Sequence, residues 1–358
     1  MKKLIGFLLF LALLGGIMLS APGCLPSPYS VGNPDSLFSG FSLAWYLADH
    51  HYSSFVVHQD VNWDQAFSQR REEALALSDW DELFDLTCDM FSTLSDGQIF
   101  FYRDRTFIPT FDTGRFANFD RGVWEDYMSE WGAQTDSEYQ LTTAMTGPDG
   151  TIGYVFIGSH NGMLSESQPP FFYMFFLATN GMENCSAIIL DLRDCLGCWS
   201  FTEAFHCSGR FMDQSYPSFY RQYRNGFGRL DMEAPVLVTS IRLGAWQFTK
   251  PVVVLTGSAT AGFAELMVLF LSRPEHVVLM GDRTAGAPDI SRPFRVNNPM
   301  NAEERWLLYL PGMVIYDLSM NPVVGVGIEP DISVPASPGD FAAGVDPVLD
   351  AAIEYLSR

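Results

Sequence analysis

Two side chains in this sequence could together carry out nucleophilic catalysis on a carbonyl group. Ser258 lies in the turn after an apolar run at 251–255, and His160 follows a second apolar run at 152–157. A histidine within hydrogen-bond reach can accept the proton of a serine hydroxyl and activate it for attack. A serine in a turn, however, is more often there for local hydrogen bonding, and a lone histidine more often has an ordinary structural role. The pair is therefore one candidate active site, and two structural residues are the alternative.

The cysteines allow three interpretations. Cys195 and Cys198 have the spacing of a redox motif, and His206 and Cys207 lie close enough in sequence to complete a zinc site with them. Of the six cysteines five follow Cys24, so at least one thiol has no partner within the chain unless it pairs with Cys24 or between chains. Buried thiols, or one or two structural disulfides, are the simpler interpretation. We therefore expect no metal and no cofactor.

Two pairs of charged residues follow apolar runs. Asp191 and Arg193 end the run at 187–192, and Asp282 and Arg283 follow the run at 277–280. A carboxylate and a guanidinium at a strand end can brace the following loop through paired hydrogen bonds. We interpret both pairs in this way and not as catalytic groups.

The elements that must position these residues alternate between strand and helix. Apolar runs predict buried strands, and the segments between them have helical character. The predicted strands are at 152–157, 187–192, 251–255 and 277–280, and the predicted helices at 171–179, 202–210, 260–272 and 346–356. Such alternation favours an α/β fold in which helices cover a sheet.

The N-terminal part of the chain has a different pattern. Residues 37–95 show helical spacing and predict a small helical domain, with Ser78 or Asp79 capping a helix at 80–94. Residues 96–358 form the predicted α/β core, with an irregular insert at 105–150.

The first residues have the order of an export signal. Lys2 and Lys3 precede an apolar stretch at 4–19, and small residues follow up to Cys24. This order resembles a bacterial lipoprotein signal, in which the cysteine after the cut is acylated. We expect loss of residues 1–23, lipid attachment at Cys24, a tether over 24–36 and a place in the bacterial envelope, periplasmic or at the surface. Simple secretion and an uncleaved anchor are the alternatives.

Composition restricts the partners of the chain. A hydrophobic content of 47% is enough for a sizeable core and excludes intrinsic disorder. The formal net charge of −21 argues against a basic surface that holds phosphates, so nucleic acid is not an expected partner.

Seven segments, in their order along the chain, together resemble one family. They are Asp96-Gly97-Gln98, Gly153-Tyr154-Val155, Asp191-Leu192-Arg193, the stretch VVVLTGSATAGFAE that ends at Glu265, the hexapeptide GDRTAG that ends at Gly286, the heptapeptide GVGIEPD that ends at Asp331, and the tetrapeptide DPVL that ends at Leu349. The family is that of the tail-specific, or C-terminal-processing, serine peptidases, with the tricorn core and the interphotoreceptor retinoid-binding protein as relatives. The resemblance covers roughly residues 37–358, without room for a PDZ domain. It implies a crotonase/Clp-protease-like β-α layered core preceded by a small helical domain.

The resemblance also locates the catalytic positions, and none carries the expected side chain. Gly262 occupies the nucleophile position, Gln98 the histidine position and Ala287 the position of a lysine base, while the orienting acid would fall at about Val324. Glycine has no side chain that could attack a carbonyl, and glutamine accepts no proton at neutral pH. The one lysine beyond the signal, Lys250, precedes the nucleophile strand at its far end. We therefore expect no peptidase activity.

The resemblance implies a binding cleft that can outlast the loss of catalysis. An extended peptide pairs with strand edges through its backbone, and the retinoid-binding relative implies that the fold can hold an apolar ligand. The residues expected at this cleft are Gly197, Cys198, Gly257, Ser258, Thr260 and Phe263. The alternatives are an active serine endopeptidase that uses Ser258 with His160 or a shifted alignment, and a purely structural envelope protein.

Overall fold

The computed structural model describes residues 37–104, 106–112, 114–159, 169–196, 200–289, 291–296 and 306–358. Cys24, His160, Gly197 and Cys198 lie outside these residues, as do the predicted signal and tether.

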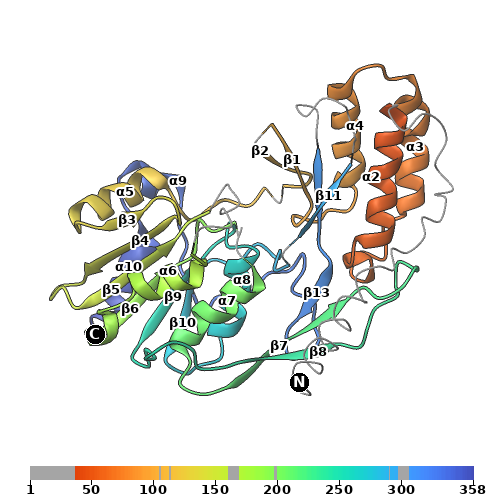
Figure 1. Cartoon of the computed structure of the whole chain (residues 1–358). Helices are drawn as coiled ribbons and strands as arrows, with labels where there is room; N and C mark the ends of the chain where they lie inside the picture. The colour runs from red at the N-terminus through yellow and green to blue at the C-terminus, as the bar shows by residue number, and fades with distance from the viewer. Residues whose placement is uncertain are drawn as a thin grey trace, which may run out of the picture.

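A seven-stranded mixed sheet forms the centre of the α/β part (Figure 1), in the order β14-β10-β9-β6-β5-β4-β3. Its strands are β3 (Gln134–Asp136), β4 (Leu141–Thr146), β5 (Ile152–Ile157), β6 (Ala187–Asp191), β9 (Val252–Thr256), β10 (Val277–Gly281) and β14 (Ile332–Ser333). The strands from β5 to β14 pair in parallel, whereas β4 pairs antiparallel with β5 and with β3. Every residue of β5, β6 and β9 is buried, because both faces of the sheet are covered.

Successive residues of β9 contact different layers of helices. Val252 and Val254 belong to a core with α6 (Phe171–Ala178), α7 (Phe201–Ser208) and α8 (Phe263–Leu271). Val253 and Leu255 point to the opposite core, with α5 (Arg121–Glu130) and α10 (Pro347–Leu356). Because successive side chains of a strand point to opposite faces, the sheet lies between two helical layers.

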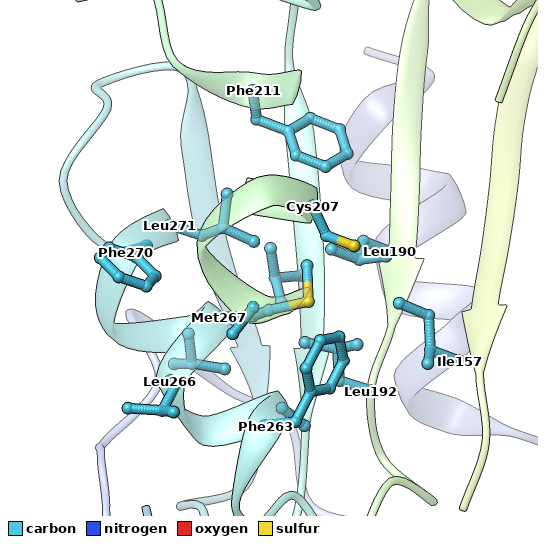
Figure 2. Close-up of a cluster of buried hydrophobic side chains, with 14 of the residues drawn as sticks. Ile157, Leu190, Leu192, Cys207, Phe211, Phe263, Leu266, Met267, Phe270 and Leu271 are labelled. Carbon is cyan, nitrogen blue, oxygen red and sulfur yellow. The ribbon is translucent and has the colours of Figure 1, made fainter. Parts of the chain in front are cut away.

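Helix α8 is the most deeply buried helix of the first layer. Figure 2 shows Phe263, Leu266 and Met267 of α8 packed near Leu190 of the sheet, with Cys207 of α7 beside them. Every residue of α8 is buried, as expected for a helix that is apolar on nearly all sides.

Three helices and a four-stranded antiparallel sheet form a second core. The helices are α2 (Leu37–His51), α3 (Trp63–Ala76) and α4 (Trp80–Ser92), and the strands, in sheet order, are β11 (Arg292–Arg295), β12 (Leu307–Leu310), β1 (Phe100–Arg103) and β2 (Thr106–Pro109). Trp63, Phe101, Trp306 and Leu308 are buried together in this core. The predicted boundary at residue 95 is therefore not a boundary of packing, because strands from beyond it complete the helical core.

A three-stranded sheet connects the two cores, in the order β13-β7-β8. Its strands are β7 (Tyr216–Tyr223), β8 (Val236–Ser240) and β13 (Met313–Tyr316). In Figure 1 the β7–β8 hairpin extends from the α/β part to the three helices. At its end, Arg229 donates hydrogen bonds to Asp49 at 2.5 Å and to Asp64 at 2.7 Å.

The remaining short elements connect these layers. They are the single-turn helices η1 (Ser54–Val56), η2 (Met182–Asn184) and η3 (Gly209–Phe211), and helix α9 (Pro338–Ala342). Across the helices of the described ranges, none has both the length and the apolar character needed to cross a membrane.

The predicted fold class, an α/β core preceded by a helical region, is confirmed. The insert at 105–150 differs from the expectation of irregular structure, because it contains β2, α5, β3 and β4. Strands β3 and β4 extend the main sheet through antiparallel pairing with β5. Only one face of β4 is fully buried, which leaves a weak apolar signal in its sequence LTTAMT.

Candidate functional site

The turn between β9 and α8 holds Gly262 in a conformation that few residues adopt. Gly262 is the N-cap of α8 with φ 55° and ψ −119°. Thr260 fixes the turn before it, because its hydroxyl accepts from the Gly257 N–H and donates to the Leu192 carbonyl, both at 2.9 Å. The Ala261 N–H donates to the Cys195 carbonyl at 3.0 Å. Backbone bonds and one buried hydroxyl therefore impose a positive φ at the predicted nucleophile position.

We expect Gly262→Ala to lower the free energy of unfolding by about 1–3 kcal/mol, because a side chain at this φ and ψ is strained. The matched control is Gly97→Ala, where the new Cβ meets no atom within 4 Å and φ is not positive. Urea unfolding of the two variants checks the prediction. Equal stability of both variants would contradict a strained position.

One loop brings the nucleophile position and the histidine position together. The Gly262 N–H donates to the Ala287 carbonyl at 2.7 Å. Two residues further along, the Asp289 N–H donates to Oε1 of Gln98 at 2.8 Å. The loop of residues 284–289, which contains Ala287, thus binds both Gly262 and Gln98. The three positions were predicted from widely separated motifs.

The position predicted for the orienting acid lies on the other side of this loop. The Gly325 N–H donates to the Gly286 carbonyl at 2.7 Å, and Val324, next to Gly325, is buried. A valine there supplies no charge or hydrogen bond to a base.

The side chain of Gln98 is buried and held at both ends of its amide. Besides accepting from Asp289, it donates from Nε2 to Oδ1 of Asp96 at 3.3 Å. The Asp96 carboxylate also accepts from the Tyr52 hydroxyl at 2.7 Å. Burial, with the Asp96 charge adding to it, raises the pKa of Tyr52 well above its ordinary value. Gln98 therefore has a structural role, and Tyr52 stays protonated beside it.

Glu265, in the first turn of α8, binds residues 284–287 of the loop through its buried carboxylate. Its carboxylate accepts from the Thr284 hydroxyl and from the N–H groups of Gly286 and Ala287, the latter two at 2.7 Å. Burial raises the pKa of Glu265 to about 7, and the three donors act in the opposite direction. Both carboxylate oxygens are occupied, so Glu265 positions the loop and is not placed to act as a base.

Asp289 is a residue of this site that sequence reasoning missed. Its carboxylate accepts from the N–H groups of Gly312 and Met313, at 2.6 and 3.0 Å. These bonds join the loop to the start of β13, more than twenty positions away, and no local sequence signal marks such a partner.

The residues of the rival active site are only partly described. The Ser258 hydroxyl donates to the Phe116 carbonyl at 3.0 Å, a bond between residues 142 positions apart, and His160 lies outside the described residues. Lys250 donates to the carbonyls of Glu183 and Cys185, at 3.0 and 2.7 Å, at the opposite end of β9 from the turn. Its ammonium group therefore binds backbone carbonyls at that end of the strand.

Asp191 and Arg193 belong to a buried ionic network, as their bracing role predicts. Arg193 donates two hydrogen bonds to Asp191, at 3.0 and 2.7 Å, and two to Asp346, both at 2.8 Å. Asp346 is also the N-cap of α10, and Tyr154 donates to Asp191 at 2.9 Å. The network fixes the loop after β6 against α10. The sequence gives no signal for the pairing of Asp346 with Arg193, because the two residues are 153 positions apart.

In the part of the chain that the structure describes, no group of three or more His, Cys, Asp or Glu residues is arranged to hold an ion. Cys88, Cys185 and Cys207 are free thiols, and burial raises the pKa of each.

The two helical layers on a mixed sheet and the tight turn into α8 define a layered α/β protein. Residues 151–334, more than half of the chain, match the model of peptidase family S41. The chain therefore belongs to peptidase family S41.

Solved structures share this fold. A Parabacteroides merdae protein assigned as a peptidase has 23% identity and a TM-score of 0.73, over 90% of this chain and 97% of its own. Mature CPAF has 12% identity and a TM-score of 0.64, over 90% and 97%. A lipoprotein from Streptococcus agalactiae has 13% identity and a TM-score of 0.53, over 89% and 98%. At these identities the likeness concerns the fold alone. Among curated protein sequences, none matches this chain.

Proposed function

We propose that this chain is an exported S41-family protein, anchored to a membrane through lipid on Cys24, that binds peptides or small apolar ligands without cleaving them. The family membership supplies the peptidase scaffold. The proposed anchor rests on the order of charged, apolar and small residues before Cys24.

The proposed loss of catalysis rests mainly on the turn before α8, where the nucleophile position has no side chain. Gly262 has the sharp helix-start conformation but no side chain, and its N–H is bonded to Ala287. Gln98, which reaches the same loop, has an amide that is engaged at both ends and takes up no proton at neutral pH. Neither a nucleophile nor a base is therefore present at these two positions.

Ligand binding requires neither a nucleophile nor a base. An extended peptide can add to an open strand edge through its backbone, with pockets that select its side chains. Strand β8 is such an edge, and Val236 and Leu237 are exposed along it. The ligand is either a peptide of this kind or a small apolar molecule.

We expect the purified protein to leave unfolded casein intact and to remain unlabelled by a fluorophosphonate probe for activated serines. An active peptidase of the same family, treated in parallel, is the positive control. Gly262→Ser is also expected to show no turnover, because adding a hydroxyl does not supply a base.

Two outcomes would contradict the proposed loss of peptidase activity. Labelling that disappears in Ser258→Ala would establish an active serine peptidase with a different centre. Turnover by Gly262→Ser would mean that a base lies near the turn after all.

A further inference from the structure

The chain passes from the helical core to the α/β part through residues 110–120, which connect β2 with α5 (Figure 1). Where the structure describes them, these residues form neither helix nor strand. Both ends are fixed, because the Thr110 hydroxyl donates to the Ile99 carbonyl at 2.9 Å and Phe119 stacks on Phe156 at 5.7 Å. Between these ends the connection contacts the loops that follow β9 and β10.

Arg115 holds this connection to the loop after β10. Its guanidinium donates to the Thr284 carbonyl at 2.7 Å, to the Arg283 carbonyl at 2.6 Å and to the Asp282 carboxylate at 3.0 Å. The side chain is 23% exposed, so solvent and salt weaken these bonds less than they would on an open surface. One side chain thus makes three bonds between this loop and residues 114–117, which we call the strap.

The rest of the strap is held less firmly. Gly114 is exposed, with φ 64° and no atom within 4 Å of a Cβ placed there. Phe116 is 46% exposed, and its ring centre lies 6.1 Å from that of Phe341. Polar bonds rather than apolar burial therefore keep the strap in place, as is typical of segments that open locally.

The strap lies against one of the residues expected at the ligand cleft. The Ser258 hydroxyl, just after β9, donates to the Phe116 carbonyl at 3.0 Å. Gly257, Thr260 and Phe263, also expected there, are buried. In open α/β sheets, ligands bind outside the carboxyl ends of the parallel strands, which is where the strap lies. A ligand that uses the Ser258 hydroxyl must therefore take the place of the Phe116 carbonyl.

A buried amide near Ser258 provides a second polar group. Asn118, which follows the strap, is 3% exposed and donates from Nδ2 to the Thr256 carbonyl at 2.9 Å. Its Oδ1 lies where a Cβ on Gly257 would overlap it, and it has no donor among the described residues. Buried acceptors normally have a donor, so this oxygen indicates an N–H group that a ligand supplies. A hydroxyl donor and an amide acceptor at neighbouring positions match the C=O and N–H groups of a peptide backbone.

We propose that the strap closes a peptide-binding site at the carboxyl ends of β9 and β10, and that an extended peptide binds there by taking the place of the strap. A carbonyl of the peptide accepts from Ser258 in place of Phe116, and an N–H of the peptide donates to Asn118. A small apolar molecule makes neither bond and would leave the Ser258 hydroxyl without its partner. The inference rests on the proposed binding function, and it selects the peptide over the apolar ligand.

Hydrogen exchange measures the closure. Deuterium uptake by residues 114–118 is followed by mass spectrometry in the wild type and in Arg115→Gln, which loses the charged bond to Asp282. We expect uptake to be about tenfold faster in the variant, because local opening no longer breaks a charge-assisted bond. Arg242→Gln is the matched control, because Arg242 is exposed and bonds to Gln247 within its own loop. Unfolding midpoints verify that each variant folds.

Fluorescence anisotropy measures the binding of a labelled peptide that copies residues 110–118. We expect it to bind the Arg115→Gln protein about tenfold more tightly than the wild type, because closure reduces the apparent affinity to the fraction of open sites. The arginine of the peptide replaces the one removed from the protein, so a copy with glutamine at that position should bind more weakly. Adding Ser258→Ala to Arg115→Gln should weaken binding by about threefold to tenfold, because one hydrogen bond is lost.

Each negative result contradicts a different part of the inference. Equal affinity of the peptide for the wild type and Arg115→Gln, or unchanged deuterium uptake, would overturn closure by the strap. Faster uptake without binding of the peptide would overturn the peptide site and leave the small apolar ligand of the proposed function. Binding that Ser258→Ala does not change would overturn the assigned contact, while peptide binding itself would stand.

Discussion

A protein with methionine in place of Arg193 is expected to lose about 3–5 kcal/mol of unfolding free energy. The side chain of Arg193 is fully buried and donates to both carboxylates beside it, Asp191 and Asp346. Removing the cation leaves two acids close together in the interior, where neither can be hydrated. Urea unfolding at neutral pH measures the loss.

The control for this prediction is an exposed pair. Arg71→Met removes the ion pair with Glu72, whose side chain is 83% exposed, and is expected to cost less than about 1 kcal/mol. The deficit of the Arg193 variant should shrink as the pH falls, because protonation discharges the two acids. A loss below about 1 kcal/mol for Arg193→Met would mean that the network contributes little to stability.

The unfolding free energy is expected to fall as the pH rises from 4.5 to 7, by about 3 kcal/mol from Glu265 alone. Burial raises the folded-state pKa of this carboxyl to about 7 from an ordinary value of 4.5. Between these values the folded protein holds a proton that the unfolded chain has released. The contribution of Glu265 is therefore fully present below pH 4.5 and lost as the pH passes 7.

Glu265→Gln isolates this contribution, because the amide does not titrate while the shape of the side chain is kept. The difference in unfolding free energy between wild type and variant should decrease with pH over this window. Since other groups titrate equally in both proteins, the difference is specific to residue 265. A constant difference would show that the donors from the loop keep Glu265 ionised at its ordinary pKa.

The parts of the fold that could be predicted are those with strong local signals. The apolar runs of β5, β6, β9 and β10 were predicted to within a residue or two. The same is true of α10, because Asp346 caps it and a proline occupies its first position. Strands β7 and β8 could not be predicted, because their polar and aromatic residues alternate unevenly and their order depends on pairing with β13.

The candidate site also has parts that the sequence predicts and parts that it does not. The motif placed Gly262 at the turn into α8, and the structure has it there. The hydrogen bond between Gln98 and Asp289 joins residues that are 191 positions apart. The one between Arg193 and Asp346 joins residues that are 153 positions apart. Such contacts arise from tertiary packing, for which the neighbouring residues carry no signal.

The helical core described above also has a consequence for synthesis. Helices α2, α3 and α4 leave the ribosome early, yet β12, which contributes Leu308 and Leu310 to their core, ends at Leu310. Until that strand is made, the apolar side of the nascent helices has no cover and must be shielded by other means. A gene truncated after residue 95 would therefore yield an aggregating fragment and not an autonomous helical bundle.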